Sequence, residues 1–127
     1  MRKFTILLFI FLVCGCATKV KDYSEADSGL IAALVSRGSD VNKEHLVSFI
    51  IDCSSEQQVS NIVSGAVQVG FEDDYISYSE KRKIWSTSLI KPLKLNLEQI
   101  SINRAKLTPL MPVSGCKPIG WGASVEL

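Results

Sequence analysis

The sequence carries almost no net charge and few of the residues on which metal sites depend. Its 14 lysines and arginines balance 13 aspartates and glutamates, so the formal net charge is +1. A nucleic-acid-binding domain usually shows a clear basic excess. There is one histidine, His45, and there are four cysteines; one cysteine is expected to be removed and one lipidated (below), whereas a structural zinc site takes four ligands. We therefore expect no metal site, no cofactor and no direct nucleic-acid binding.

Recognisable catalytic motifs are also missing. The chain contains no phosphate-binding glycine loop, dinucleotide fingerprint, nucleophile elbow or metalloprotease helix motif. A catalytic His45 would need a nucleophile and an orienting acid, and no serine or cysteine motif accompanies the nearby Glu44 and Asp52. We expect His45 to lie at a strand start, paired to backbone or water, and the protein not to be an enzyme. A small envelope enzyme or ligand-binding domain dependent on His45 or Asp52 is the alternative.

The one long apolar run is too short for a membrane-spanning helix. Residues 4–13 are apolar except for Thr5, whereas a transmembrane helix needs about 20 such residues. The run follows Arg2 and Lys3, which is the layout of a secretory signal.

The end of this run resembles a bacterial lipobox. Residues 12–16 read Leu-Val-Cys-Gly-Cys, and the resemblance implies cleavage before Cys16 and lipidation of that cysteine. Ala17, rather than aspartate, follows, which by resemblance to bacterial sorting rules favours the outer membrane, facing the periplasm. We expect a signal peptide over 1–15, a lipidated tether over 16–26 and a domain over 27–127. Loss of two of the 14 basic residues would leave 12 against 13 acidic residues.

The domain begins with a helix and a strand. Apolar residues at helical spacing between Leu30 and Val35 predict a short helix that begins at Asp27 or Ser28 and ends at Gly38. Residues 45–53 are rich in β-branched and aromatic residues and predict a strand. Its odd positions form an apolar face and its even positions a mixed one, which is typical of a sheet covered on one side.

A second helix and a hairpin follow. Ser54 and Gln57 form a candidate capping box. Behind it, one apolar stripe runs towards Gly70, where the helix should stop: Val59, Ile62, Val63 and Ala66. Residues 71–79 and 84–90 predict the strands of a hairpin that Pro92 closes.

The chain ends in a third helix and an extended segment. Asn96 is a candidate N-cap; Leu97, Ile100 and Leu107 are expected on one side of this helix, and Pro109 should end it near Leu107 or Thr108. The order of elements matches the split β-α-β-β-α-β arrangement. We predict an α+β, ferredoxin-like antiparallel sandwich with two helices on one face and a short N-terminal helix.

This topology brings two cysteines together. The fourth strand lies antiparallel beside the first, so Cys53 at the end of one and Cys116 at the start of the other could face each other. A disulfide would suit the oxidising periplasm; two buried free thiols are the alternative.

Two charged runs flank the hairpin. Glu72, Asp73 and Asp74 are expected to be a solvated strand edge that discourages edge pairing, or else a weak site for a cation or basic partner. Residues 81–83, Lys-Arg-Lys, are expected to be a polar turn, or else a contact for phospholipid headgroups.

Several segments resemble the ribonuclease E inhibitor family, also called regulator of ribonuclease activity B. They are the strand entry at 40–52, Gly70-Phe71, Trp85, and 115–126 with its Gly120-Trp121-Gly122. Pro118 and Ile119 stand where the family prefers Tyr-Asp. The resemblance implies a non-enzymatic protein that binds the scaffold region of ribonuclease E and changes RNA decay.

The signal and the resemblance lead to two hypotheses. The first is an envelope lipoprotein that acts by binding an unidentified protein, as an immunity-type inhibitor in one version. The second is a cytosolic inhibitor of ribonuclease E whose N-terminal run is not processed. In either case Gly120, Trp121 and Gly122 form the candidate partner site, because Trp is enriched at interface hot spots and glycines permit close backbone approach; a structural role for Trp121 is the alternative.

Overall fold

The computed structural model describes residues 22–126. The expected signal peptide, residues 1–15, and the expected lipidation site Cys16 lie outside the described residues. Between residues 22 and 126, no helix is both long and apolar enough to cross a membrane.

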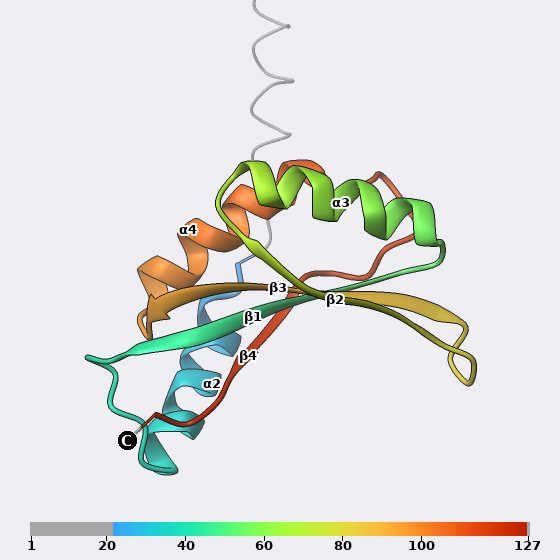
Figure 1. Ribbon diagram of the computed structural model, residues 1–127. Coiled ribbons are helices and arrows are strands. Elements are labelled where there is room, and N and C mark those ends of the chain that lie inside the picture. Colours follow the sequence, from blue (N-terminus) through green and yellow to red (C-terminus); the bar gives the residue numbers. More distant parts are fainter. Residues whose placement is uncertain (1–21, 127) are drawn as a thin grey trace, which may run out of the picture.

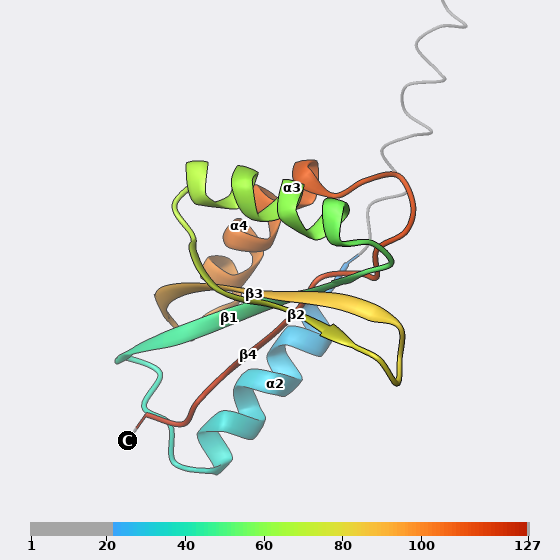
Figure 2. The same cartoon turned by 45° about the vertical axis from the view of Figure 1, so that its right-hand side comes forward.

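Four antiparallel strands form a single sheet in the order β2-β3-β1-β4. The strands are β1 (Glu44–Cys53), β2 (Glu72–Ser79), β3 (Ile84–Lys94) and β4 (Gly120–Ala123). Helices α3 (Glu56–Gln68) and α4 (Leu97–Leu107) lie over one face, and the short η1 (Thr108–Leu110) follows α4 (Figure 1). Helix α2 (Ser24–Ser36) lies beside β4 in both views (Figure 2). The predicted ferredoxin-like order with an N-terminal helix is confirmed.

Strand β1 shows why the sheet is covered on one side only. Its odd-numbered side chains, including Val47, Phe49 and Ile51, are fully buried against the helices. On the opposite face Leu46 is 55% exposed and Ile50 is 38% exposed. The expected apolar and mixed faces of this strand are therefore confirmed.

Helix α3 begins one residue later than predicted. The capping box consists of Ser55 and Gln58: the Ser55 hydroxyl accepts from the Gln58 N–H, and the Gln58 side chain accepts from the Ser55 N–H. Ser55 has the extended backbone that an N-cap requires. The helix buries Val59, Ile62 and Ala66 as expected. Gly70, with φ +99°, terminates it in the left-handed conformation that favours glycine.

The predicted start of α2 is wrong. The N-cap position is Tyr23 and the helix starts at Ser24, so Asp27 lies inside the first turns instead of capping them. The reason is tertiary: the Asp27 carboxylate bonds to α4 and β4 rather than to its own backbone. Gly38 ends the turn after α2 with φ +104°, as predicted.

Pro92 does not close the hairpin but lies within β3, opposite Leu46 of β1. The pairing of β2 with β3 stops at Ile90, opposite Glu72. At Pro92, β3 therefore has a neighbour on one side only, and its missing N–H interrupts no ladder on the other.

The bounds of α4 lie close to the predicted ones, whereas β4 is shorter than predicted. The Asn96 side chain accepts from the Gln99 N–H at 2.8 Å, and α4 ends at Leu107, both as predicted. Leu97 was expected on the apolar side of the helix, but it is 38% exposed. Of the extended segment expected from Cys116 onward, only Gly120–Ala123 forms a strand.

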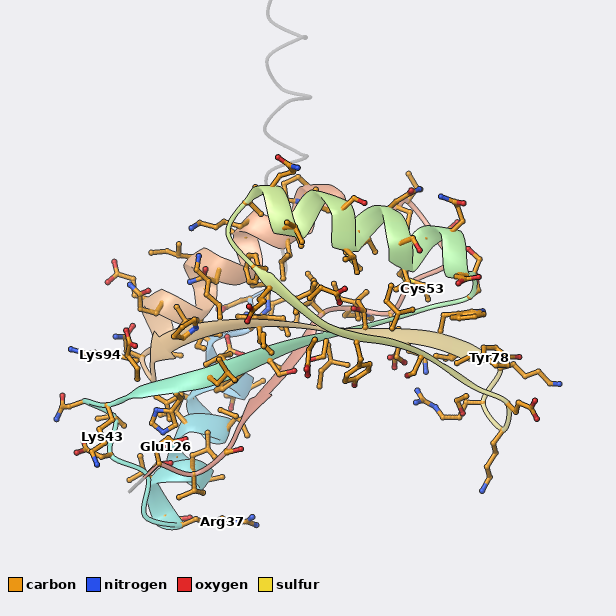
Figure 3. The ribbon with its side chains drawn as sticks, in the orientation of Figure 1. Arg37, Lys43, Cys53, Tyr78, Lys94 and Glu126 are labelled. Atoms are coloured by element: carbon orange, nitrogen blue, oxygen red, sulfur yellow. A yellow bond between two sulfur atoms is a disulfide. The ribbon has the colours of Figure 1, made fainter. Side chains whose placement is uncertain are left out.

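A disulfide joins the end of the first strand to the start of the predicted fourth strand. Cys53 and Cys116 form it across an isolated antiparallel bridge. The neighbouring backbone supports the contact, because Ser54 N–H donates to Gly115 and Lys117 N–H donates to Asp52. Cys53 lies at the end of β1, close to α3 (Figure 3). This is the pairing expected from the topology, rather than two free thiols.

Replacing both cysteines by alanine should destabilise the fold strongly. The bond spans 63 residues, and closing a loop of that size stabilises by about 4 kcal/mol in the chain-entropy model. Urea unfolding of the double variant should show this loss, and a reductant should produce no further change in it. Equal unfolding midpoints for the double variant and the oxidised wild type would contradict the assignment.

Candidate functional site

A cavity in the described part of the chain opens between the start of α2, helix α4 and the segment that leads into β4. Its volume is about 810 Å³, within the range of small-ligand pockets. Apolar side chains form much of its wall, namely Leu97, Ala105, Met111, Pro112, Pro118 and Ile119. Its exposed polar lining residues include Asp22, Glu98 and Lys117.

One wall of the cavity contains a buried ion pair. Arg104 of α4 donates from Nη1 to Asp27 Oδ2 at 2.7 Å and from Nη2 to Oδ1 at 2.8 Å. The Asp27 side chain is 5% exposed and that of Arg104 is 11% exposed. The Tyr23 ring lies 4.2 Å from the guanidinium carbon, a cation–π contact. This bidentate ion pair fixes α2 against α4.

Trp121 completes this cluster from β4. Its indole N–H donates to Asp27 Oδ1 at 3.0 Å, and the residue lies opposite Phe49, on the buried face of the sheet. Asp27 thus accepts three hydrogen bonds from two elements. The contacts of Trp121 identify it as an anchor within the fold.

The two glycines beside Trp121 lie on the other side of β4. Gly120 and Gly122 alternate with it and face the uncovered side of the sheet, near Ile50 and Ser48. A side chain at Gly122 would meet no atom within 4 Å, and at Gly120 only the Ile50 carbonyl. Packing therefore does not require glycine at either position. A role for Gly120, Trp121 and Gly122 in partner binding stays a prediction.

The hydrogen bonds from Arg104 hold the pKa of Asp27 below its ordinary value, against the opposing effect of burial; the Trp121 bond acts in the same direction. Asp27 and Arg104 therefore neutralise each other as an ion pair. Arg104 Nε has no partner within residues 22–126. Since the pair is internally compensated, this wall offers a rigid polar surface for binding rather than a reactive group.

His45 lies elsewhere, at the start of β1, and is buried. Its Nδ1 is 3.0 Å from the Lys43 carbonyl, and its Nε2 is 3.1 Å from the Ser39 hydroxyl. That hydroxyl also accepts the Glu126 N–H, so it can donate its own proton to His45. The expected backbone pairing at the strand start is confirmed.

Asp52 is also engaged structurally. Burial raises its pKa, but hydrogen bonds from Ser86 and Arg82 outweigh burial and leave that pKa below its ordinary value. Ser86 donates at 2.6 Å and Arg82 at 3.0 Å. Asp52 and His45 do not contact each other, because they lie at opposite ends of β1. Within the described residues, no group of three or more His, Cys, Asp or Glu side chains could hold a metal ion.

The most distinctive pair of this site has no recognisable sequence pattern. Local sequence marks Asp27 only as a candidate helix cap and gives Arg104 no special role. Their positions are 77 residues apart, and no local pattern connects them. One available signal was an arginine placed between Ile100 and Leu107 on an otherwise buried helix side.

Comparison with known proteins identifies the family. The family model described as regulator of ribonuclease activity B matches residues 24–123, from the first residue of α2 to the last of β4. The chain therefore belongs to this family, a family of regulators. A search of curated proteins found no match.

Replacing Asp27 by asparagine should destabilise the protein by about 3–5 kcal/mol, because it leaves Arg104 buried without a counter-ion. The wild-type carboxylate stabilises the fold at pH above its ordinary pKa of 3.8. That contribution is lost as the pH falls through the lower folded pKa. Denaturant unfolding at several pH values measures both effects.

Glu25→Gln is the matched control, because Glu25 is an exposed carboxylate in the first turn of the same helix. It should cost less than about 1 kcal/mol. The ion pair does not hold α2 in place if Asp27→Asn is as stable as this control. The same conclusion follows if Asp27→Asn loses as much stability in acid as the wild type does.

Proposed function

We propose that this member of the regulator of ribonuclease activity B family is a non-enzymatic lipoprotein that acts by binding another protein. It would be tethered through lipid on Cys16 to the outer membrane and would face the periplasm. An immunity-type inhibitor, directed at an incoming toxin or an envelope enzyme, is the specific version we favour.

The disulfide between Cys53 and Cys116 carries this proposal. Disulfides form and persist in oxidising compartments and are rare in the cytosol. The secretory layout of residues 1–16 supports the same compartment independently. The two observations agree although they come from different parts of the chain.

The site supports binding rather than catalysis. Its cavity combines apolar walls with a neutralised ion pair, and His45 and Asp52 each have structural partners instead of each other. A surface of this kind can seat an apolar group of a partner protein while its polar groups orient that partner.

A second candidate, suggested by the description of the family, is a cytosolic regulator of RNA degradation that binds ribonuclease E. In this version the N-terminal run is retained and Cys53 and Cys116 are reduced. The compartment decides between the two, because ribonuclease E is reachable only from the cytosol.

The full chain, expressed in bacteria supplied with labelled palmitate, should incorporate the label and fractionate with the membrane. Cys16→Ser should abolish labelling, since it removes the acceptor thiol, whereas Cys14→Ser should retain it. Unlabelled, soluble wild-type protein would reject the envelope proposal.

A separate measurement tests the second candidate. Purified ribonuclease E should cleave RNA at an unchanged rate when the oxidised chain is added, if the envelope proposal holds. Stoichiometric inhibition, together with alkylation of both Cys53 and Cys116 in unreduced cell extract, would instead establish the cytosolic regulator.

A further inference from the structure

Strand β2 leaves one edge of the sheet open. Within residues 22–126 it pairs with β3 alone, so along its other edge the backbone N–H and C=O groups have no strand partner among the described residues. Every residue of β2 except Ser79 is exposed. The turn of the β2–β3 hairpin lies away from the helices in both views, and Tyr78 lies near that turn in Figure 3. Such an edge is a template for another strand.

The edge carries more apolar surface than a solvated strand needs. Tyr75 is 44% exposed, Ile76 is 38% exposed and Tyr78 is 43% exposed. Tyr75 faces the uncovered side of the sheet, opposite Ser88, whereas Ile76 and Tyr78 face the other side, opposite Thr87 and Trp85. An added strand would therefore find aromatic or aliphatic side chains on both faces.

Charge is separated along the same edge. The strand begins with three carboxylates, Glu72, Asp73 and Asp74, and the turn beyond it carries three cations against one carboxylate, at residues 80–83. Arg82 is bonded to Asp52 at 3.0 Å, while Lys81 and Lys83 are exposed. The two ends of the edge therefore have opposite sign.

We propose that a second copy of this chain docks on this edge, with the two β2 strands antiparallel around a two-fold axis. Antiparallel pairing inverts the order of charges, so the acidic start of each copy meets the basic turn of the other. Parallel pairing would bring like charges together. The result is a continuous eight-stranded sheet across the dimer.

The irregularity in β2 sets the centre of the pairing. Its register against β3 shifts between Asp73 and Tyr75, which leaves Tyr75–Ser79 as the regular stretch. The middle residue of that stretch is Ser77, which therefore faces its own copy across the axis. The charges and the bulge discourage pairing with an arbitrary strand, but the charges favour this chain's own edge.

Cysteine cross-linking of the full chain tests the geometry. Directly opposite residues in antiparallel strands have Cα atoms about 4.5–5.5 Å apart, a separation that a disulfide spans. Under an added oxidant, Ser77→Cys should give a covalent dimer on a non-reducing gel. Ser64→Cys, exposed on α3, should give no more dimer than the wild type. Absence of the Ser77→Cys dimer, or equal dimer from both variants, would overturn the proposal.

Charge reversal tests the partner's identity. In the Ser77→Cys background, Lys81→Glu should lower the cross-linked fraction at a fixed short time about tenfold. The two-fold axis places residue 81 of each copy opposite Asp73 of the other, so the substitution creates two repulsive contacts. Adding Asp73→Lys should restore it, since the signs are then exchanged. An unchanged fraction in the single reversal, or no recovery in the combined variant, would exclude a second copy paired in this way. Neither result depends on lipidation or on ribonuclease regulation.

Discussion

The arrangement of the helices depends on one buried ion pair. Asp27 and Arg104 join the N-terminal helix to α4, and Trp121 adds β4 through the same carboxylate. Removing either charge would leave the other uncompensated in a buried setting, which costs far more than an exposed pair contributes. The pair therefore fixes the position of α2 relative to α4 and β4, since the guanidinium, the carboxylate and the indole are all hydrogen-bonded in only one position of that helix. The cavity wall that contains Asp27 and Arg104 forms because α2 is held in this position.

The disulfide constrains another part of the lining of the same cavity. Cys116 lines the cavity while Cys53 ends β1, so the bond ties the segment before β4 to the central strand. Gln58 supports that segment as well: it caps α3 and donates to the Ser114 carbonyl at 3.1 Å. Gly115 has φ +98°, the left-handed conformation that favours glycine, and a side chain there would also displace the end of Gln58. Covalent and hydrogen-bonded constraints together hold the segment that lines the cavity.

The molecule consequently offers two kinds of surface. One is concave and rigid, built from three elements around a compensated ion pair. The other is an open strand edge whose charges complement an inverted copy of themselves. Neither surface requires a reactive group, in keeping with a family of regulators that work by contact. The two surfaces involve different elements, so a partner in the cavity and a second copy on the edge would not compete for residues.

Local patterns were sufficient for the order of elements, the buried face of β1, the stripe of α3 and the stops at Gly38 and Gly70, because these depend on periodicity and on backbone preferences of near neighbours. They also placed Cys53 opposite Cys116, since topology constrains strand ends. Tertiary contacts decided the rest. Helix α2 starts at Ser24 because Asp27 is drawn to Arg104, and Pro92 fits in β3 because the pairing with β2 does not extend past Ile90. An ion pair 77 residues apart in sequence leaves no periodic trace, so only the folded chain could reveal it.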